Sequence, residues 1–597
     1  MGLPDRKDVP VQQTWDVGIL YENDDAWQKD IEAEKKALSD FSKYDQKLND
    51  PETIIAALDD LGEMEVRMDQ LGHYGFLQQS TDMTDPHYNQ LLRILDQLDA
   101  DYNAELAKYR AQIMDNDNET LDAVSDKRPD LGAAIREFKR IKKHRLSGEV
   151  ESALSSIEPT LSSFEGIYTT CRAADMSFPD FEVDGKTYPL SFVLYENSYQ
   201  YNPDHKLRHA AFKAFSKVLN QYKNTVAANY YAQVSKEKNM ATLRRYDSVF
   251  DYLLDNQEVP REFFDRQIDV IIEKLGPVMQ KYVKLIQKER GLDKLTFSDL
   301  QIDLDPEFAP KVPLDKAPEY ISDAIKILGP EYHDMIMKCF DERWVDFPAN
   351  KGKETGGFET TPYGNHAYIL MSWTDEMADV YTLVHELGHA GQEMLTNKTN
   401  HPLSCGVSTY IVEAPSTFNE LLLTHALEEK SSDKRMKRFA LTKMLTNTYY
   451  HNFVTHLLEA AFQREVYKLI DNGEGFDGDR LCEIKKAVLK KFWGDAVEID
   501  DDAALTWMRQ SHYYMGLYPY TYSASLTIST QAYLKIKEQG QPAVDAWLKF
   551  LKFDNCPAPI EAAKIAGVDI TTDEPLQNTI KFLDETVDKI AELTKEL

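Results

Sequence analysis

Apolar residues recur three and four positions apart along most of the 597-residue chain, the spacing that places them on one face of an α-helix. This periodicity begins near Trp15 and returns after short interruptions as far as the C-terminal region. Alternation typical of strands occurs at 177–194, where Asp184-Gly185 predicts a tight turn. The short, aromatic and Gly-rich segment 356–373 predicts a second hairpin. The pattern therefore predicts a mainly α-helical fold with only a small hairpin or sheet.

Composition and charge narrow the class of protein. The chain is 42% hydrophobic and 28% charged, and its length ordinarily corresponds to more than one domain. The net charge of −32 disfavours nucleic acid and anionic membranes as partners, and no apolar run approaches the ~20 residues needed to cross a bilayer. The first residues, MGLPDRKDVP, lack the apolar core of a secretory signal. We therefore expect a cytoplasmic protein that binds neither nucleic acid nor membranes.

Residues 374–397, TDEMADVYTLVHELGHAGQEMLTN, predict a helix that carries an H-E-x-x-H motif. Thr374 suits an N-cap, acidic residues follow it, and no proline interrupts the run. His385 and His389 lie on one face, where both imidazoles can bind one metal ion. Glu386 projects about 100° around the helix, beside that metal. The arrangement is typical of catalytic zinc sites, where a carboxylate takes a proton from water.

A third ligand is available downstream. The metzincin pattern is absent, because Gln392 and Leu395 stand where its glycine and third histidine would be. Glu413 follows His389 by 24 residues, and Glu420 comes two helical turns later on the same face. One of these carboxylates can bind zinc while the other orients a ligand.

Pro415 indicates where the helix with these glutamates begins. A proline is tolerated in the first turn of a helix, so we place the start near Ile411 and Glu413 close to the beginning. If this helix runs antiparallel to the first, Glu413 lies opposite the two histidines.

The motifs HELGHA and VEAPSTFNE together resemble the thimet oligopeptidase and oligoendopeptidase F group of zinc peptidases, and oligoendopeptidase F is the closer match. Further segments extend the resemblance along nearly the whole chain: TWDVGILY at 14–21, HRLSGEVE at 144–151, RYDSVFDYLL at 245–254 and ERWVDFPANKGKETGGF at 342–358.

This resemblance implies a two-lobed helical metallopeptidase with a deep central cleft. It implies an N-terminal helical domain at 1–200 that flanks the cleft, and a helical catalytic domain at 201–597. It also implies one Zn²⁺ per chain, with Glu386 as general base and a zinc ligand set of His385, His389 and Glu413. Glu420 would hydrogen-bond the far nitrogen of a ligand histidine.

Donors for the oxyanion are expected in RQSHYYMGLYPYTYSASL, where five tyrosines follow His512 within ten residues. Each of these tyrosines could equally be a core residue. The family pattern of a histidine followed by spaced tyrosines favours His512 and Tyr522 as catalytic residues, and Tyr520 after them. The register matches oligoendopeptidase F without gaps and departs by a residue or two from the thimet branch.

Two further segments allow two interpretations each. We expect 356–373 to form a hairpin beside the metal helix, with Tyr368 and Gly357 binding substrate if its strand is an edge that pairs with a peptide backbone. The alternative is an ordinary core strand. The basic run from Arg136 to Arg145 is either a solvated face that pairs with nearby carboxylates or a site for a substrate carboxylate.

The sequence therefore predicts a zinc-dependent oligoendopeptidase that cleaves internal bonds of short, unstructured peptides of about five to twenty residues. One alternative is a zinc carboxypeptidase or dipeptidyl carboxypeptidase, which needs a cation for the C-terminal carboxylate of its substrate. Another is a non-catalytic peptide-binding protein whose zinc is structural and held by four protein ligands. The sequence indicates no oligomeric state.

Overall fold

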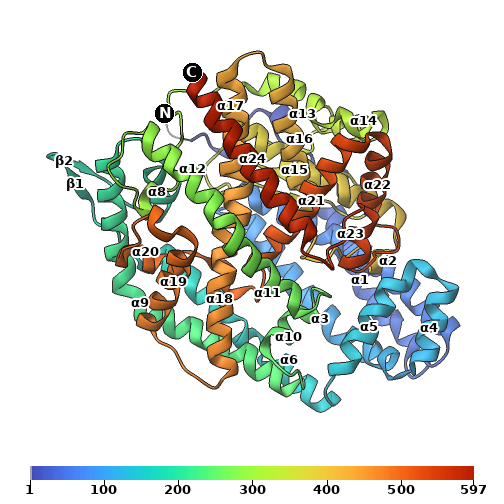
Figure 1. Ribbon diagram of the computed structural model, residues 1–597. Coiled ribbons are helices and arrows are strands. Elements are labelled where there is room, and N and C mark those ends of the chain that lie inside the picture. Colours follow the sequence, from blue (N-terminus) through green and yellow to red (C-terminus); the bar gives the residue numbers. More distant parts are fainter. Residues whose placement is uncertain (1–2) are drawn as a thin grey trace.

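The computed structural model describes residues 3–597 and is mainly α-helical, as the periodicity predicts (Figure 1). No helix within this range combines the length and the apolar composition that a bilayer crossing requires. The helices of the N-terminal part are α1 (Asp24–Asp40), α2 (Pro51–Thr81), α3 (Pro86–Asp115), α4 (Asn118–Lys127), α5 (Gly132–His144), α6 (Gly148–Leu161) and α7 (Ser163–Thr170).

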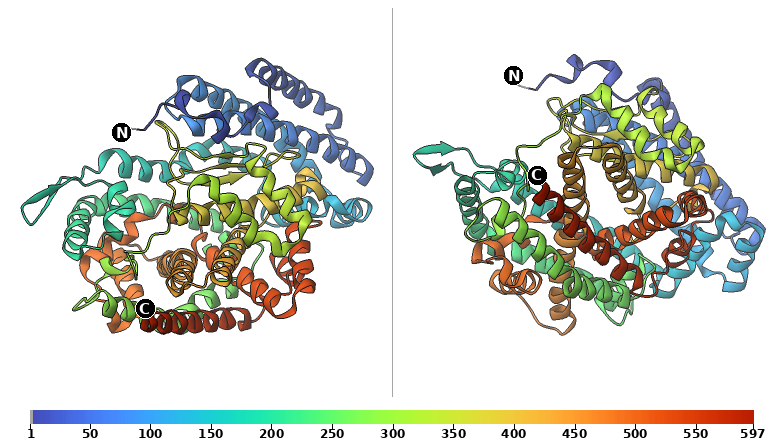
Figure 2. Two further views of the ribbon diagram at one scale, coloured as in Figure 1. Left: turned by 90° about the horizontal axis from the view of Figure 1, so that it is seen from above. Right: turned by 45° about the horizontal axis from the view of Figure 1, so that its top comes forward.

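Helices α1 to α5 form a layer along one side of the molecule (blue in Figure 2). Their buried apolar residues make separate small clusters, which include Ile31 and Leu71 in one and Leu58 and Leu106 in another. The start of the chain contacts the sheet beside the metal-motif helix, where Trp15 packs with other buried residues, namely Leu77, Tyr368 and Leu370.

The basic run on α5 forms ion pairs within the N-terminal part and with the helices that follow it. Arg136 pairs with Glu258 at 2.8 Å and Arg140 contacts Asp255, both in the segment around α10. Other pairs join the run to its own neighbourhood: Lys139 with Asp122 and Arg145 with Asp115. These contacts favour the interpretation as a charge-paired face over a site for a substrate carboxylate.

One large hydrophobic cluster extends from Tyr168 to Ile590 and unites the rest of the protein. Its helices before the metal motif are α8 (Phe192–Asn197), α9 (His205–Leu243), α10 (Val249–Asp255), α11 (Arg261–Val270), α12 (Gly276–Glu289), α13 (Ala317–Ile325) and α14 (Pro330–Met337). The division into domains at residue 200 stays a prediction.

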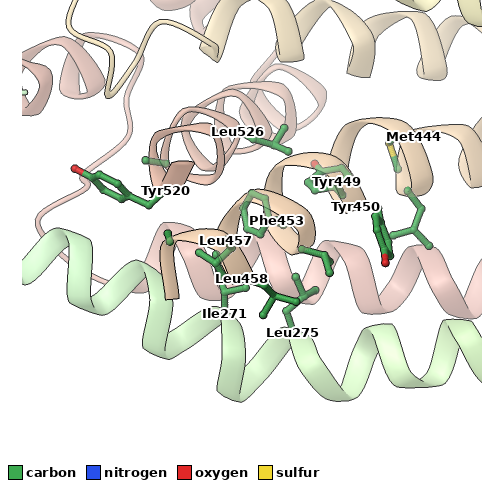
Figure 3. Packing of buried hydrophobic residues seen from close by; sticks show 14 of the residues in the cluster. Ile271, Leu275, Met444, Tyr449, Tyr450, Phe453, Leu457, Leu458, Tyr520 and Leu526 are labelled. Atoms are coloured by element: carbon green, nitrogen blue, oxygen red, sulfur yellow. The ribbon is translucent and has the colours of Figure 1, made fainter. Parts of the chain in front are cut away.

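The helices from the metal motif onward complete this cluster. They are α15 (Met377–Thr399), α16 (Ala414–Lys430), α17 (Lys434–Lys443), α18 (His456–Asp471), α19 (Gly478–Trp493), α20 (Asp501–Ala504), α21 (Pro519–Gln539), α22 (Gln541–Lys552), α23 (Pro559–Ile565) and α24 (Glu574–Glu596). A π-helical segment, η14 (Met444–Thr455), joins α17 to α18. Figure 3 shows Phe453 of η14 and Leu457 of α18 packed toward Ile271 and Leu275, which anchors this segment in the core.

The predicted hairpin at 177–194 consists of strands β1 (Phe181–Val183) and β2 (Lys186–Tyr188), which pair antiparallel. Asp184 and Gly185 both have positive φ, of 50° and 77°, as a tight two-residue hairpin turn requires. The hairpin projects from the body of the molecule (Figure 1).

The second sheet lies beside α15 and consists of β3 (Val345–Asp346), β4 (Phe358–Thr360) and β5 (Tyr368–Leu370). Its order is β3-β5-β4, with β5 parallel to β3 and antiparallel to β4. The hairpin within 356–373 is therefore confirmed, and of the two interpretations of its Tyr368 strand the structure shows a core strand. Because β5 is paired on both sides, the strand at the edge of this hairpin is β4.

Candidate active site

The two helices of the candidate metal site begin slightly later than the sequence predicts. Helix α15 starts at Met377, with Glu376 as N-cap and Asp379 completing a capping box, so Thr374 is not the N-cap. Thr374 instead donates its backbone N–H to the Asp379 carboxylate at 2.7 Å. Helix α16 begins at Ala414 rather than near Ile411.

Glu413 is the N-cap residue of α16, and Pro415 lies in the first turn, as predicted. The Ser416 hydroxyl donates to Oε2 of Glu413 at 3.0 Å, which holds this carboxylate in place. The position of the Glu413 carboxylate also depends on how closely α15 and α16 cross. A Cβ atom on Gly388 would lie only 2.5 Å from the carbonyl oxygen of Pro415.

The three expected ligand side chains converge. Oε2 of Glu413 lies 3.5 Å from Nε2 of His385 and 3.3 Å from Nε2 of His389. In a tetrahedral zinc site with ligand distances of roughly 2.0–2.1 Å, neighbouring ligand atoms are about 3.3 Å apart. The donor set therefore fits zinc in both atom type and spacing.

Glu420 occupies the far side of His385. Its Oε1 lies 2.7 Å from Nδ1 of His385, while the Thr448 hydroxyl donates to its other oxygen. A proton on Nδ1 is thereby favoured, which leaves Nε2 of His385 as the nitrogen that can bind a metal.

The charges of the site also suit a cation. Burial lowers the pKa of His385, but the hydrogen bond to Glu420 and the surrounding carboxylates outweigh it and raise this pKa to about 10. Burial opposes ionisation of Glu413, yet the charge of His389 and other contacts lower the Glu413 pKa to about 2. Burial raises the pKa of Glu386, against the charges of the two histidines. This excess of negative groups draws a proton to His385, and a bound metal ion satisfies the same demand.

Glu386 lies where β4 begins. A Cβ atom on Gly357 would be 3.6 Å from Oε1 of Glu386 and 3.2 Å from the Thr382 side chain. Gly357 is exposed, and the strand that follows it, β4, is an edge strand of the sheet that can meet a peptide backbone. The role of Gly357 in binding substrate stays a prediction.

Tyr368 and Tyr520, by contrast, point into the protein. The Tyr368 ring is fully buried and its hydroxyl donates to the backbone oxygen of Asp16 at 3.0 Å. The hydroxyl of the fully buried Tyr520 donates to Gln257 at 2.6 Å, and Figure 3 shows this ring at the edge of the buried cluster. These two assignments are corrected, because both hydroxyls are bonded within the core.

His512 and Tyr522 are both partly exposed and lie together, with ring centroids 5.8 Å apart. The Tyr518 ring contacts both residues: its centroid lies 5.2 Å from that of Tyr522 and 5.9 Å from that of His512. Burial, and after it the charges of Tyr518 and Glu413, raise the pKa of the Tyr522 hydroxyl, which therefore stays protonated and able to donate.

Three residues beside His512 were not predicted from the sequence: His451, His456 and Glu459. His456 stacks on Tyr522, with centroids 4.2 Å apart, and its Nδ1 lies 2.8 Å from Oε2 of Glu459. All three residues line a cavity of about 850 Å³ that also reaches His512. The spacing His-x-x-Glu at 456–459 places both side chains on one helical face and was the available signal.

The chain is similar in sequence to known peptidases along nearly its whole length. Residues 198–582 match Peptidase family M3. Oligopeptidase PepF of Bacillus subtilis (strain 168) is 29% identical over 99% of this chain and 88% of its own length. An oligoendopeptidase F homolog of Borreliella burgdorferi is 26% identical over 98% of this chain and 99% of its own length.

The fold also agrees with a solved structure. The crystal structure of oligoendopeptidase-F from Enterococcus faecium superposes with a TM-score of 0.74 and 21% identity, covering 96% of this chain and 100% of that one. At this level of identity the likeness shows a shared fold.

Proposed function

The chain belongs to peptidase family M3 and is a metalloendopeptidase, and on that premise we propose that it is a zinc-dependent oligoendopeptidase for short, unstructured peptides. The observation that carries the proposal is the convergence of Glu413 Oε2 with the Nε2 atoms of His385 and His389 at 3.3 to 3.5 Å. When bound there, zinc supplies a Lewis acid that acidifies water and polarises a peptide carbonyl.

Glu386 is the proposed general base. It adjoins the ligand His385 on α15 without being part of the converging set, and Gly357 leaves space in front of its carboxylate. Its carboxylate takes a proton from the attacking water and passes it to the nitrogen of the leaving amine.

His512 and Tyr522 are the proposed donors to the oxyanion that forms on the peptide carbonyl. Their ring centroids lie 5.8 Å apart and both residues are partly exposed. An N–H and an O–H aimed at the developing negative charge stabilise the transition state more than the substrate. Strand β4 holds the substrate backbone by pairing with it, and Gly357 lets that backbone approach Glu386 closely.

The size of the substrate follows from how deeply the ligands lie. The relative solvent exposure of the side chains is 27% for His385, 17% for His389 and 12% for Glu413. An extended peptide can reach them, whereas a bond in a folded protein cannot.

A carboxypeptidase would need a free cation for the terminal carboxylate of its substrate. Lys485 and Arg509 line the cavity beside His512, but Arg509 is bonded to Glu196 at 3.1 Å and the charge of Lys485 interacts with Glu459. Arg509 is therefore paired with a carboxylate of the protein, and the negative charge of Glu459 acts on Lys485, which favours endopeptidase activity. A C-terminally amidated octapeptide should be cleaved as fast as the free acid, and failure to cleave it would favour a carboxypeptidase.

A structural zinc site would need a fourth protein ligand. The group around Glu413 contains three metal-binding side chains within the described residues, which leaves a position for water. Treatment with a chelator should abolish cleavage of an internally quenched peptide, and added Zn²⁺ should restore it. Full activity in the metal-free protein would reject the proposal.

A further inference from the structure

Four side chains adjoin the proposed oxyanion donors and take no part in the chemistry described above. Nδ1 of His456 lies 2.8 Å from Oε2 of Glu459, and Nε2 of His456 lies 3.0 Å from Nε2 of His451. Nδ1 of His512 lies 3.8 Å from the same oxygen of Glu459. The fourth side chain, that of Lys485, is buried and interacts with Glu459 through its charge.

These residues come from separate parts of the chain. His451 lies in the π-helical segment η14, His456 and Glu459 lie in the first turn of α18, and His512 lies in the short helical segment Ser511–Tyr514. A π-helical segment shifts the side chains that follow it around the helix axis, and such segments are frequent at functional sites. Here it brings two histidines, five residues apart, to one wall of the cavity.

A second metal site is one reading of His456, Glu459 and His512, since their donor atoms lie within 4.8 Å of one another. The distances favour a hydrogen-bonded group. The 2.8 Å separation of His456 and Glu459 is that of an N–H donor and a carboxylate, and is shorter than the about 3.3 Å between two ligands of one zinc ion. Lys485 already supplies a positive charge beside this carboxylate.

Glu459 is held in its ionised form despite its burial. Its side chain is only 2% exposed. Burial raises the pKa of its carboxyl, but the charge and hydrogen bond of His456, together with His512 and Lys485, outweigh this and keep the pKa well below its usual range. The Glu459 carboxylate is thus a buried anion, 3.8 Å from Nδ1 of His512.

The Nδ1 atom of His512 is buried and has no hydrogen-bond partner. The nearest carboxylate oxygen is Oε2 of Glu459, and a movement of about 1 Å would bring the two atoms to the usual hydrogen-bond distance. Catalytic hydrogen bonds are often long in the free enzyme and shorten when substrate binds.

We propose that Glu459 is a positioning residue that closes on Nδ1–H of His512 when substrate binds, and so directs Nε2–H of His512 toward the oxyanion. An imidazole that donates through both nitrogens is positively charged, and the buried carboxylate stabilises that charge. Through His456, which stacks on Tyr522, the same carboxylate also supports the second donor. This inference rests on the proposed roles of His512 and Tyr522.

A double-mutant cycle on kcat tests the inference, with an internally quenched, terminally blocked octapeptide as substrate. We expect Glu459→Gln to lower kcat roughly 10²-fold, to change KM less than about threefold and to leave one bound zinc per chain. In a His512→Gln background the same change should lower kcat less than about threefold further, because Glu459 acts through His512. Glu465→Gln, an exposed carboxylate on the same helix, is the matched control and should behave as the wild type.

Thermal stability needs its own control, because Glu459→Gln removes the negative charge that acts on the buried Lys485. The double variant Glu459→Gln/Lys485→Met removes both charges and should recover thermal stability but not kcat. The inference would be overturned if the losses of kcat in the Glu459 and His512 variants multiplied in the double-mutant cycle. It would also be overturned if kcat recovered in the Glu459→Gln/Lys485→Met variant, or if the wild type bound a second metal ion that Glu459→Gln lost. The proposed function is tested without Glu459, by zinc dependence and by the loss of activity in Glu386→Gln. The proposed function and the inference about Glu459 can therefore fail separately.

Discussion

The carbonyl oxygen of Pro415 lies 2.5 Å from the position that a Cβ atom on Gly388 would occupy, and Cα of Ser416 lies 2.6 Å from it. Helices α15 and α16 therefore cross so closely that a side chain has no room at this point. Gly388 is the residue immediately before the ligand His389, and Pro415 comes two residues after the ligand Glu413. The close approach is what brings the carboxylate within reach of both imidazoles.

Gly388→Ala should consequently impair both stability and metal binding. A methyl group at this crossing pushes the backbones apart, and overpacking of this kind destabilises by roughly 1–3 kcal/mol. Bound zinc should fall below one equivalent, as measured by metal analysis after gel filtration. Gly72→Ala in α2 is the control, since a Cβ there meets nothing within 4 Å and alanine favours a helix. Unchanged zinc content and stability in Gly388→Ala would mean that the helices can separate without consequence.

Glu420→Gln should weaken zinc binding while leaving the three ligands in place. The carboxylate 2.7 Å from Nδ1 of His385 makes Nε2 a better ligand, and loss of such a partner typically lowers metal affinity 10–100-fold. Competition with a chromophoric chelator measures the affinity. If Glu420→Gln binds zinc as tightly as the wild type, the contact does not tune the site.

Tyr522→Phe and Tyr520→Phe should separate catalysis from stability. Removal of the Tyr522 hydroxyl should lower kcat roughly 10²- to 10³-fold with little change in thermal stability, because one oxyanion donor is lost. Removal of the Tyr520 hydroxyl leaves buried Gln257 without its partner and should destabilise by about 1–3 kcal/mol while kcat stays near the wild-type value. The reverse pattern would show that Tyr520 faces the substrate.

Short peptides should be better substrates than long chains. The partly buried ligand side chains require the substrate to enter as an extended strand, and a tightly folded protein cannot do so. A series of peptides from five to about thirty residues, together with reduced and unfolded casein, compared by kcat/KM per cleavable bond, measures the limit. If the long chains are cleaved as fast per bond as an octapeptide, the metal site is more open than the burial of its ligands indicates.

Local rules of the sequence predict the helical fold and the metal-motif residues. Helical periodicity identifies the fold class, and the spacing of His385 and His389 places them on one face. Pro415 locates the start of α16 within three residues, because proline is tolerated only in the first turn. Asp184-Gly185 identifies the β1–β2 turn for an equally local reason, the positive φ of both residues.

Contacts between distant segments were not predictable in this way. Strand β5, which contains Tyr368, is central rather than at an edge, because β3, more than twenty residues earlier, pairs with it in parallel. Tyr520 and Tyr522 lie two residues apart on α21, about 200° around the helix, so only the packing of that helix decides which one faces inward. The approach of Glu459 to His512 across 53 residues depends on how η14, α18 and the Ser511–Tyr514 segment pack.

The central claim is that this chain binds catalytic zinc through His385, His389 and Glu413, with Glu386 as general base. The most direct test is to measure bound zinc and kcat together in Glu386→Gln. The account predicts one zinc per chain, as in the wild type, and a kcat lower by roughly 10³-fold or more, because only the proton acceptor is removed. Loss of the zinc, or a kcat close to that of the wild type, would contradict it.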